Sequence, residues 1–262
     1  MHNNLDTYIY RNHLLQVSPQ QKLWFAIALV LMALITHPIT QLLIAVWLGV
    51  WTVGYARIPV KVYLRVLMVA GLFLLTSIPA LVLNIVSVEE IASVQLDQVG
   101  GVAVGQWYLF VSRSGLIQAF EIGIRSLACT CCLLFILFTI PFIDILKVLQ
   151  KWHFPTILTE LLLLMYRFVF LFLDIVTQLQ LAQRARGGYR TRQRWMYSVG
   201  LLVSQLLVRS LQSYHHFSLA LNSRGFKGNF QFHSNQSYIY SKRYAIESVI
   251  GCIGLVILDF RL

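Results

Sequence analysis

Four long apolar runs in the first half of the chain restrict it to a fold that lies largely within a lipid bilayer. Of its 262 residues, 58% are hydrophobic and only 12% are charged, whereas soluble domains carry roughly a quarter charged residues. A helix needs about 20 apolar residues to cross a bilayer. We therefore expect an all-α polytopic membrane protein, with spans near residues 22–36, 39–56, 62–86 and 116–142.

Local signals indicate where these spans begin and end. Ser18 and Pro19 suit the N-cap and the first helical position of the first span. That span is short, and His37-Pro38 separates it from the second, which predicts a tight hairpin. Pro79 predicts a kink in the third span. Residues 87–114 are expected to form a long loop outside the membrane.

Charge is distributed unevenly along the chain, whose formal net charge is +11. Thirteen Lys and Arg residues lie between Pro141 and Arg243 against three acids, so the positive-inside rule places this half in the cytoplasm. No nucleic-acid-binding motif accompanies the basic residues, and we expect no nucleic-acid partner. Within the fourth span, Glu121 and Arg125 are four residues apart, which favours a structural ion pair over a functional pair of intramembrane charges.

The pattern of the chain changes after Pro141. A short amphipathic helix is expected at 142–152, followed by long helices at about 156–186 and 195–223 and by a last apolar helix at 244–260. The predicted organisation has three parts: an N-terminal bundle of four spans (1–141), a cytoplasmic region of long amphipathic helices (142–240) and a C-terminal transmembrane helix (241–262).

The helix predicted at 156–186 is apolar except for one stripe, formed by Glu160, Arg167 and Asp174 at seven-residue spacing. Such a helix could be a further span. A charged stripe beside a broad apolar face fits better with a rod at the inner surface of the membrane, or packed beneath the bundle. We expect about five spans, and six stays open because the last apolar helix is short.

The sequence Ala-x-x-x-Arg-Gly occurs twice, 38 residues apart, and each copy closes a segment with helical periodicity. Glycine after the last helical residue can adopt the left-handed conformation that ends a helix, and an Arg just before it suits the negative end of the helix dipole. Each copy could be an ordinary helix cap. Their repetition instead indicates two equivalent docking sites for a two-fold or pseudo-two-fold partner. The candidate docking residues are Ala182, Ala185, Arg186, Gly187, Ala220, Ser223, Arg224 and Gly225.

No motif for catalysis, nucleotide binding or metal binding is recognisable. The chain has no P-loop, no G-x-G-x-x-G and no zinc-protease or serine-hydrolase signature, so another chain must bind ATP if ATP is used. The four cysteines lie in apolar runs and are expected to be inert, buried thiols. His215 and His216 project in different directions on a helix, which suits joint chelation poorly. We expect no catalytic residues, no cofactor and no metal ligands.

These features resemble the transmembrane T-component of energy-coupling-factor (ECF) transporters, in its cobalt-type branch. The doubled Ala-x-x-x-Arg-Gly sequence is similar to the two coupling motifs of that family. Leu5-Asp6-x-Tyr8 followed by Ser18-Pro19-x-x-Lys22-Leu23 resembles the opening segment of the family, and Gly115-Leu116 through Arg125-Ser126-Leu127-Ala128 resembles the entry to its fourth span. The resemblance covers nearly the whole chain.

The resemblance implies a non-catalytic subunit of an ABC importer in the bacterial cytoplasmic (inner) membrane, with its coupling region in the cytoplasm. Its partners would be two ABC-type ATPase subunits, a membrane S-component that binds the metal, and the lipid bilayer. Arg186 and Arg224 would each dock in a groove of one ATPase, and ATP-driven closure would swing the two long helices and reorient the S-component. The cargo would be cobalt, for cobalamin biosynthesis, with nickel or a vitamin as alternatives.

Two functions of other classes are compatible with a polytopic membrane protein. An integral membrane enzyme acting on lipid or isoprenoid would need a cluster of carboxylates or histidines facing one cavity, which the sparse charges do not offer. A self-contained channel or carrier would move metal without any ATPase.

Overall fold

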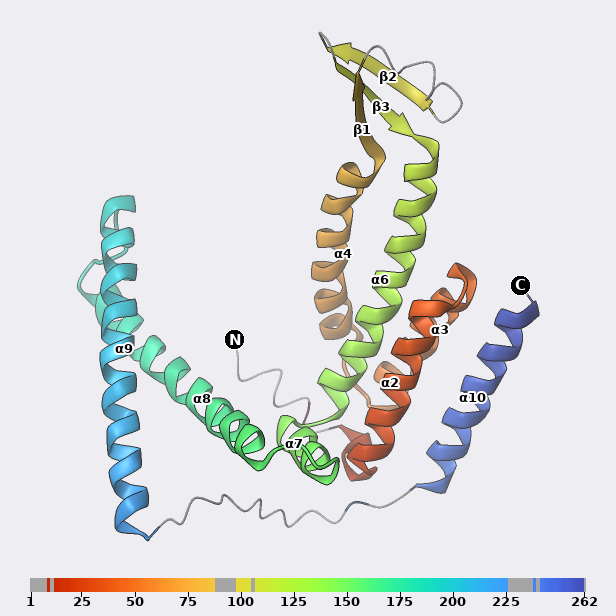
Figure 1. Ribbon diagram of the computed structural model, residues 1–262. Helices are drawn as coiled ribbons and strands as arrows, with labels where there is room; N and C mark the ends of the chain where they lie inside the picture. The colour runs from red at the N-terminus through yellow and green to blue at the C-terminus, as the bar shows by residue number, and fades with distance from the viewer. Residues whose placement is uncertain are drawn as a thin grey trace. The chain divides into compact units, whose positions relative to one another are not determined.

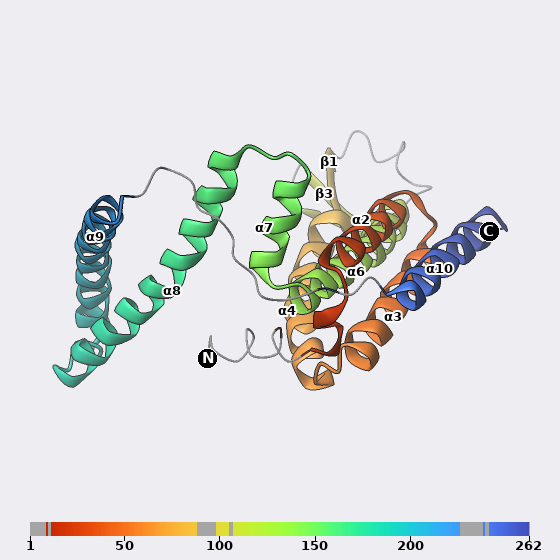
Figure 2. The ribbon, with the colours of Figure 1, turned by 90° about the horizontal axis from the view of Figure 1, so that it is seen from below.

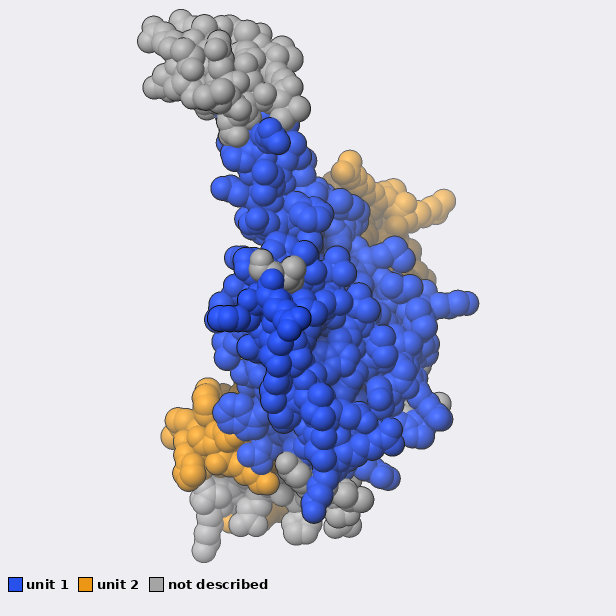
Figure 3. Space-filling model, turned by 90° about the vertical axis from the view of Figure 1, so that its right-hand side faces the viewer, with its two compact units in different colours: residues 1–144, 236–262 blue, residues 145–235 orange. Residues whose placement is uncertain are grey.

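The computed structural model describes residues 9, 12–87, 98–104, 107–225, 238 and 241–261. These residues form long helices and one small sheet (Figure 1). The chain forms two compact units, drawn in different colours in Figure 3: residues 1–144 with 236–262, and residues 145–235. The prediction of an all-α polytopic membrane protein is confirmed, since helices predominate and four of them are long and apolar enough to cross a bilayer.

The helices of the first unit follow the apolar runs of the sequence. The first of them begins at Pro19, as predicted, with Ser18 at the N-cap, although the Ser18 side chain makes no capping hydrogen bond. The second run forms an α-helix that continues as a π-helix. In chain order the elements are η1 (His13–Gln16), α2 (Pro19–Ile35), α3 (Pro38–Val50), η2 (Trp51–Tyr55), α4 (Val60–Val82), α6 (Arg113–Thr139) and α10 (Lys242–Arg261).

The set of apolar helices differs in part from the expected spans. α2 has 17 residues and is a shorter apolar helix. α10, expected to be the final span, is 20 residues long but carries too many charged residues to be a candidate span. The long helix that we expected at the membrane surface, α8 (Thr156–Ala185), is a candidate span. By length and composition, the four described candidates are Pro38–Tyr55, Val60–Val82, Arg113–Thr139 and Thr156–Ala185.

The hydrophobic core of the first unit lies between α2, α3 and α6, which run side by side in Figures 1 and 2. Phe25 of α2 is at its centre, and three aromatic rings lie 5.0–5.8 Å from its ring centroid. They belong to Trp47, Trp51 and Phe135. Two of the cysteines, Cys131 and Cys132, are buried in this core, where thiols act as small apolar side chains.

α10 is attached to α3 by a helix cap that the sequence did not reveal. Asp259 Oδ1 accepts a hydrogen bond from the backbone N–H of His37 at 2.9 Å and another from Thr40 Oγ1 at 3.0 Å. A carboxylate at this position satisfies a free N–H group and complements the positive end of the α3 dipole. Further along α10, a Cβ at Gly251 would lie 2.1 Å from the ring of Trp47, so glycine is required where the two helices touch.

The prediction of a long loop at 87–114 is wrong for the part of this segment that the structure describes. The chain forms a three-stranded antiparallel sheet of order β1-β3-β2, made of β1 (Leu83–Ser87), β2 (Gln98–Val104) and β3 (Trp107–Ser112). β1 follows α4 directly and β3 leads into α6, so the sheet joins these two helices (Figure 1). β3 reads Trp-Tyr-Leu-Phe-Val-Ser, and aromatic and β-branched residues favour strands.

The ion pair expected between Glu121 and Arg125 does not form. Both side chains are exposed on α6, and the described part of the chain contains no ion pair that involves either of them. Spacing by four residues brings two side chains to one face of a helix, but their rotamers decide whether they meet.

Pro79 lies inside α4 three residues before its end.

Candidate functional site

Both copies of the repeated motif end a long helix of the second unit. The first copy closes α8 (Thr156–Ala185) and the second closes α9 (Arg192–Ser223). Arg186 and Arg224 occupy the C-cap positions with almost the same backbone angles, φ −91° and ψ 9° for the first and φ −91° and ψ 7° for the second. The following glycines, Gly187 and Gly225, have φ of +70° and +68°. The two helix ends are therefore conformational copies of each other.

Hydrogen bonds at the first end form a Schellman cap. The N–H of Gly187 donates to the carbonyl of Arg184 at 3.0 Å, and the N–H of Gly188 donates to the carbonyl of Gln183 at 2.9 Å. At the second end, the N–H of Gly225 donates to the carbonyl of Asn222 at 3.1 Å, which repeats the first of these bonds. The prediction that each glycine adopts the left-handed conformation is confirmed.

The side chains around both caps are exposed. Arg186 and Arg224 are open to solvent, and within the described ranges neither guanidinium takes part in an ion pair or a side-chain hydrogen bond. The cap glycines have open space where a Cβ would be. Each helix thus presents its C-cap arginine at a blunt end whose last carbonyls carry partial negative charge. The small flanking residues are exposed as well: Ala182, Ala185, Ala220 and Ser223.

Arg184 precedes the first cap arginine by two residues and is also exposed. It lies two positions before the C-cap, within the last helical turn, whereas Arg186 is at the C-cap itself. The equivalent position in the second copy is Asn222, which carries no charge. Only Arg186 therefore has a counterpart in both backbone conformation and charge.

Polar contacts brace the turn between α8 and α9. Gln183 Nε2 donates to the carbonyl of Ser198 at 2.9 Å, and the Tyr189 hydroxyl donates to Gln183 Oε1 at 2.6 Å. Ser198 Oγ donates to the carbonyl of Gly188 at 2.9 Å. A Cβ at Gly188 would lie only 2.6 Å from that same Oγ. We did not identify this brace from the sequence; the consecutive glycines at 187 and 188 are the signal that could have revealed a close approach.

A second contact joins the two helices far from the turn. The rings of Phe168 and Phe217 lie 5.9 Å apart at an interplanar angle of 85°, and the guanidinium carbon of Arg167 lies 4.8 Å above the Phe217 ring. Edge-to-face rings and a cation over an aromatic face are both favourable. Arg167, expected in a polar stripe, therefore helps to hold α8 against α9.

The geometry sets the spacing of the two cations. α8 and α9 form an antiparallel hairpin with Arg186 at its turn and Arg224 at the far end of α9. α9 has 32 residues, so the two guanidinium groups are separated by roughly 48 Å along the hairpin. A partner that binds both must offer two sites at a comparable distance.

The described residues contain no group of three or more His, Cys, Asp or Glu side chains placed to hold a metal ion. The rings of His215 and His216 are 6.4 Å apart and tilted by 59°. The arrangement at the two helix ends is suited to binding acidic or carbonyl-rich surfaces rather than to chemistry.

The structure thus defines a multi-pass helical membrane protein with a second unit of paired long helices that end in matched cations. The family model for cobalt transport protein CbiQ matches residues 11–237, which shows that the chain belongs to the CbiQ family of cobalt transport proteins. The resemblance to the cobalt-type T-component inferred from the sequence is thereby confirmed.

Individual relatives agree with this assignment. The chain is 28% identical to cobalt transport protein CbiQ of Salmonella typhimurium over 229 residues, which cover 86% of this chain and 98% of that protein. It is 32% identical to cobalt transport protein CbiQ of Rhodobacter capsulatus over 137 residues, 52% of this chain and 54% of that protein. It is 30% identical to the putative fused cobalt transport protein CbiMQ of Methanocorpusculum labreanum over 125 residues, 48% of this chain and 21% of that protein.

Proposed function

We propose that this chain is the energy-coupling membrane subunit of an ECF-type ABC importer for cobalt. It links two ATPase subunits in the cytoplasm to a membrane S-component that binds the metal, and it has no catalytic role of its own. The observation that carries the proposal is the conformational identity of the two helix ends at Arg186 and Arg224. Two equal cations on one hairpin suit a partner made of two equivalent subunits.

The docking chemistry follows from the properties of arginine. A guanidinium group is always charged and presents five donors in a fixed plane, so it can pair with carboxylates and carbonyls in a groove. Because Arg186 and Arg224 have no intramolecular partner among the described residues, docking breaks no existing bond. The small residues Ala182 and Ala220, one helical turn before each arginine, allow a groove wall to approach closely.

Coupling follows from the hairpin geometry. If ATP binding brings two docking grooves of the ATPase pair together, both ends of the hairpin are drawn inward at once. The contacts at Gln183–Ser198 and Phe168–Phe217 join α8 to α9, so the two helices would swing about these contacts when their ends approach. This is a shear or hinge motion driven by nucleotide, and it would tilt a membrane partner that rests on the hairpin.

Cobalt is the proposed cargo because the family model and the relatives are named as cobalt transport proteins. Nickel or a vitamin would use the same coupling chemistry, since the cargo contacts the S-component and not this chain. Uptake of labelled cobalt and nickel by cells that express the complete complex distinguishes these cargoes.

The decisive experiment replaces both docking arginines. We expect Arg186→Glu with Arg224→Glu to abolish co-purification of the ATPase subunits while membrane insertion stays normal. Truncating one buried, paired charge at an interface typically weakens binding by about 2–5 kcal/mol, and reversal of two charges exceeds this.

Arg184→Glu with Arg190→Glu is the matched control. This pair introduces the same total charge change as the double variant, but neither residue occupies a C-cap, so ATPase recovery should fall much less. Full recovery of ATPase with the Arg186→Glu and Arg224→Glu double variant would refute the docking role. A larger loss of ATPase with Arg184→Glu than with Arg186→Glu would assign the first docking site to Arg184 instead.

A further inference from the structure

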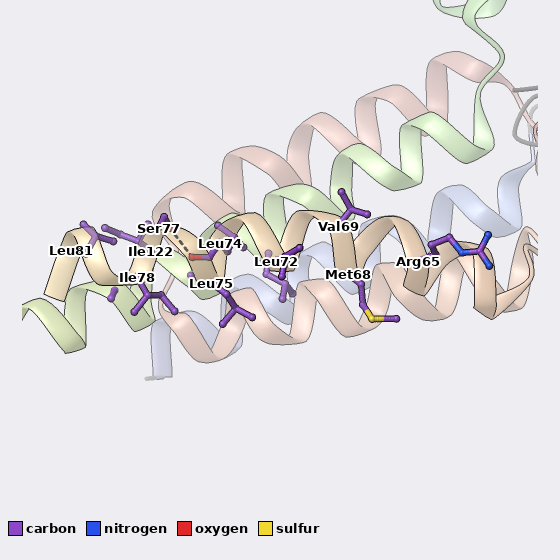
Figure 4. A pocket seen from close by; sticks show the side chains of 14 residues that line it. Arg65, Met68, Val69, Leu72, Leu74, Leu75, Ser77, Ile78, Leu81 and Ile122 are labelled. Carbon is purple, nitrogen blue, oxygen red and sulfur yellow. Dashed lines mark hydrogen bonds between the residues drawn. The ribbon is translucent and has the colours of Figure 1, made fainter. Parts of the chain in front are cut away.

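An apolar groove lies between α4 and α6 in the first unit (Figure 4). Its cavity volume is about 720 Å³. Apart from Arg65 and Ser77, the residues that line it are apolar or glycine, and they include Met68, Leu72, Leu75 and Ile122. Both helices are candidate membrane spans, so the groove faces the hydrocarbon region of the bilayer.

α4 and α6 are in close contact at both ends of the groove. At one end Tyr63 is buried in the core cluster that contains Cys131. At the other end a Cβ at Gly115 would lie 2.7 Å from the carbonyl oxygen of Leu81, so the backbones are in close contact. Between these points, a Cβ at Gly71 or Gly123 would meet nothing within 4 Å. These two glycines line the groove without adding a side chain to it.

One end of the groove is basic. Arg65 lines it, and Lys61 lies one helical turn further toward the start of α4, so both project from the same side of the helix. Both side chains are exposed, and among the residues that the structure describes neither forms an ion pair. The positive-inside rule places this end of α4 at the inner face of the membrane.

We propose that this groove binds an anionic phospholipid of the inner leaflet. Its phosphate lies between Lys61 and Arg65, and an acyl chain lies along the groove toward Gly71 and Gly123. The lining of α4 runs from Arg65 to Leu81, a length of about 24 Å. This is most of the roughly 30 Å of hydrocarbon in a bilayer, so a chain from the inner leaflet fills the half of the groove next to Arg65.

The distribution of charge favours a lipid over a helix of another protein. The two cations at one end and the almost wholly apolar lining beyond them match a molecule with an anionic head and an aliphatic tail. The proposal does not depend on the ATPase docking described above.

The test uses the purified full-length chain in phosphatidylcholine nanodiscs that contain a small fraction of phosphatidylglycerol with a photoreactive acyl chain. After illumination, mass spectrometry locates the adducts. We expect them on α4 between 65 and 81 and on α6 between 119 and 127. Phosphatidylcholine with the same photoreactive chain should label these peptides far less. Each basic residue near an anionic head group strengthens lipid binding by roughly fivefold. Lys61→Gln with Arg65→Gln should therefore lower labelling by phosphatidylglycerol by about 30-fold.

Two further variants separate the groove from general effects of charge and folding. Arg190→Gln with Arg192→Gln removes the same charge from the second unit and should leave the labelling of α4 and α6 unchanged. Gly71→Leu fills open space and should reduce labelling without altering elution or thermal stability. Equal labelling by both lipids, or adducts spread evenly over α3 and α10, would overturn the proposal. A third result would also overturn it: in the assembled complex, another membrane subunit crosslinks to the cysteine of Gly71→Cys and no lipid adduct is found.

Discussion

Gly188 offers the most direct test of the brace that stiffens the first helix end. In Gly188→Ala, the new Cβ would lie 2.6 Å from Ser198 Oγ and 3.0 Å from the carbonyl oxygen of Gln183. Ser198 must rotate away and lose its hydrogen bond to the carbonyl of Gly188. Overpacking costs about 1–3 kcal/mol and one neutral hydrogen bond about 1 kcal/mol, so we expect the turn to be destabilised by about 2–4 kcal/mol.

Hydrogen–deuterium exchange measures this local change. If the turn opens independently of the rest of the hairpin, the capping amides near the end of α8 should exchange at least 30-fold faster, since about 1.4 kcal/mol corresponds to a factor of ten. Gly188→Ala with Ser198→Ala removes the closest clashing atom and should restore much of the protection. The clash with the carbonyl of Gln183 remains, so the recovery is partial.

Two results would refute the reasoning about the brace. One is unchanged exchange in Gly188→Ala, which would show that the turn accommodates a methyl group freely. The other is a double variant that is less protected than the single one, which would show that the hydrogen bond of Ser198 matters more than the clash. Gly200→Ala is a matched control, because a Cβ there meets nothing within 4 Å.

Two further predictions concern the second helix end and the attachment of α10. In Gly225→Ala the new Cβ meets no clash, but the residue must hold φ near +68°, so the end of α9 should be destabilised by about 1–2 kcal/mol. Gly225→Asn should be destabilised less, because Asn tolerates this conformation. Equal losses of amide protection in the two variants, measured by hydrogen–deuterium exchange, would contradict a backbone origin. Asp259→Ala removes the cap of α3 and should weaken the attachment of α10 by about 1–2 kcal/mol. Faster modification of the Cys252 thiol by a maleimide would report this, whereas Glu247→Ala, which loses only the exposed pair with Arg243, should leave the rate unchanged.

The parts of the fold that could be predicted from sequence rest on local physics. Apolar runs interrupted by Pro and Gly define the helices, and Ser18-Pro19 marks the start of α2 within one residue. The left-handed glycines follow from helix termination, which needs only the few residues around Gly187 and Gly225. The family assignment followed from the same paired signature together with the pattern of the N-terminal segment.

The parts that could not be predicted depend on contacts between distant residues. Asp259 caps a helix that begins more than 200 residues earlier in the chain, and no local pattern connects the two. β1 and β3 pair across a segment whose charge and glycines suggested a loop, because strand pairing depends on a partner as well as on propensity. The four-residue spacing of Glu121 and Arg125 permitted an ion pair, but spacing alone does not determine whether two exposed side chains meet.

The two helix ends have the same shape but unequal support. At the first, Gln183, Tyr189 and Ser198 anchor the turn to the neighbouring helix. At the second, among the residues described up to Gly225, the Ser223 hydroxyl bonds only within its own helix. In the proposed complex, two identical ATPases would therefore bind helix ends that differ in their described contacts. The hydrogen bonds of the first end to α9 would transmit a displacement at Arg186 directly to both helices, so the two identical ATPases would act on unequal parts of this chain.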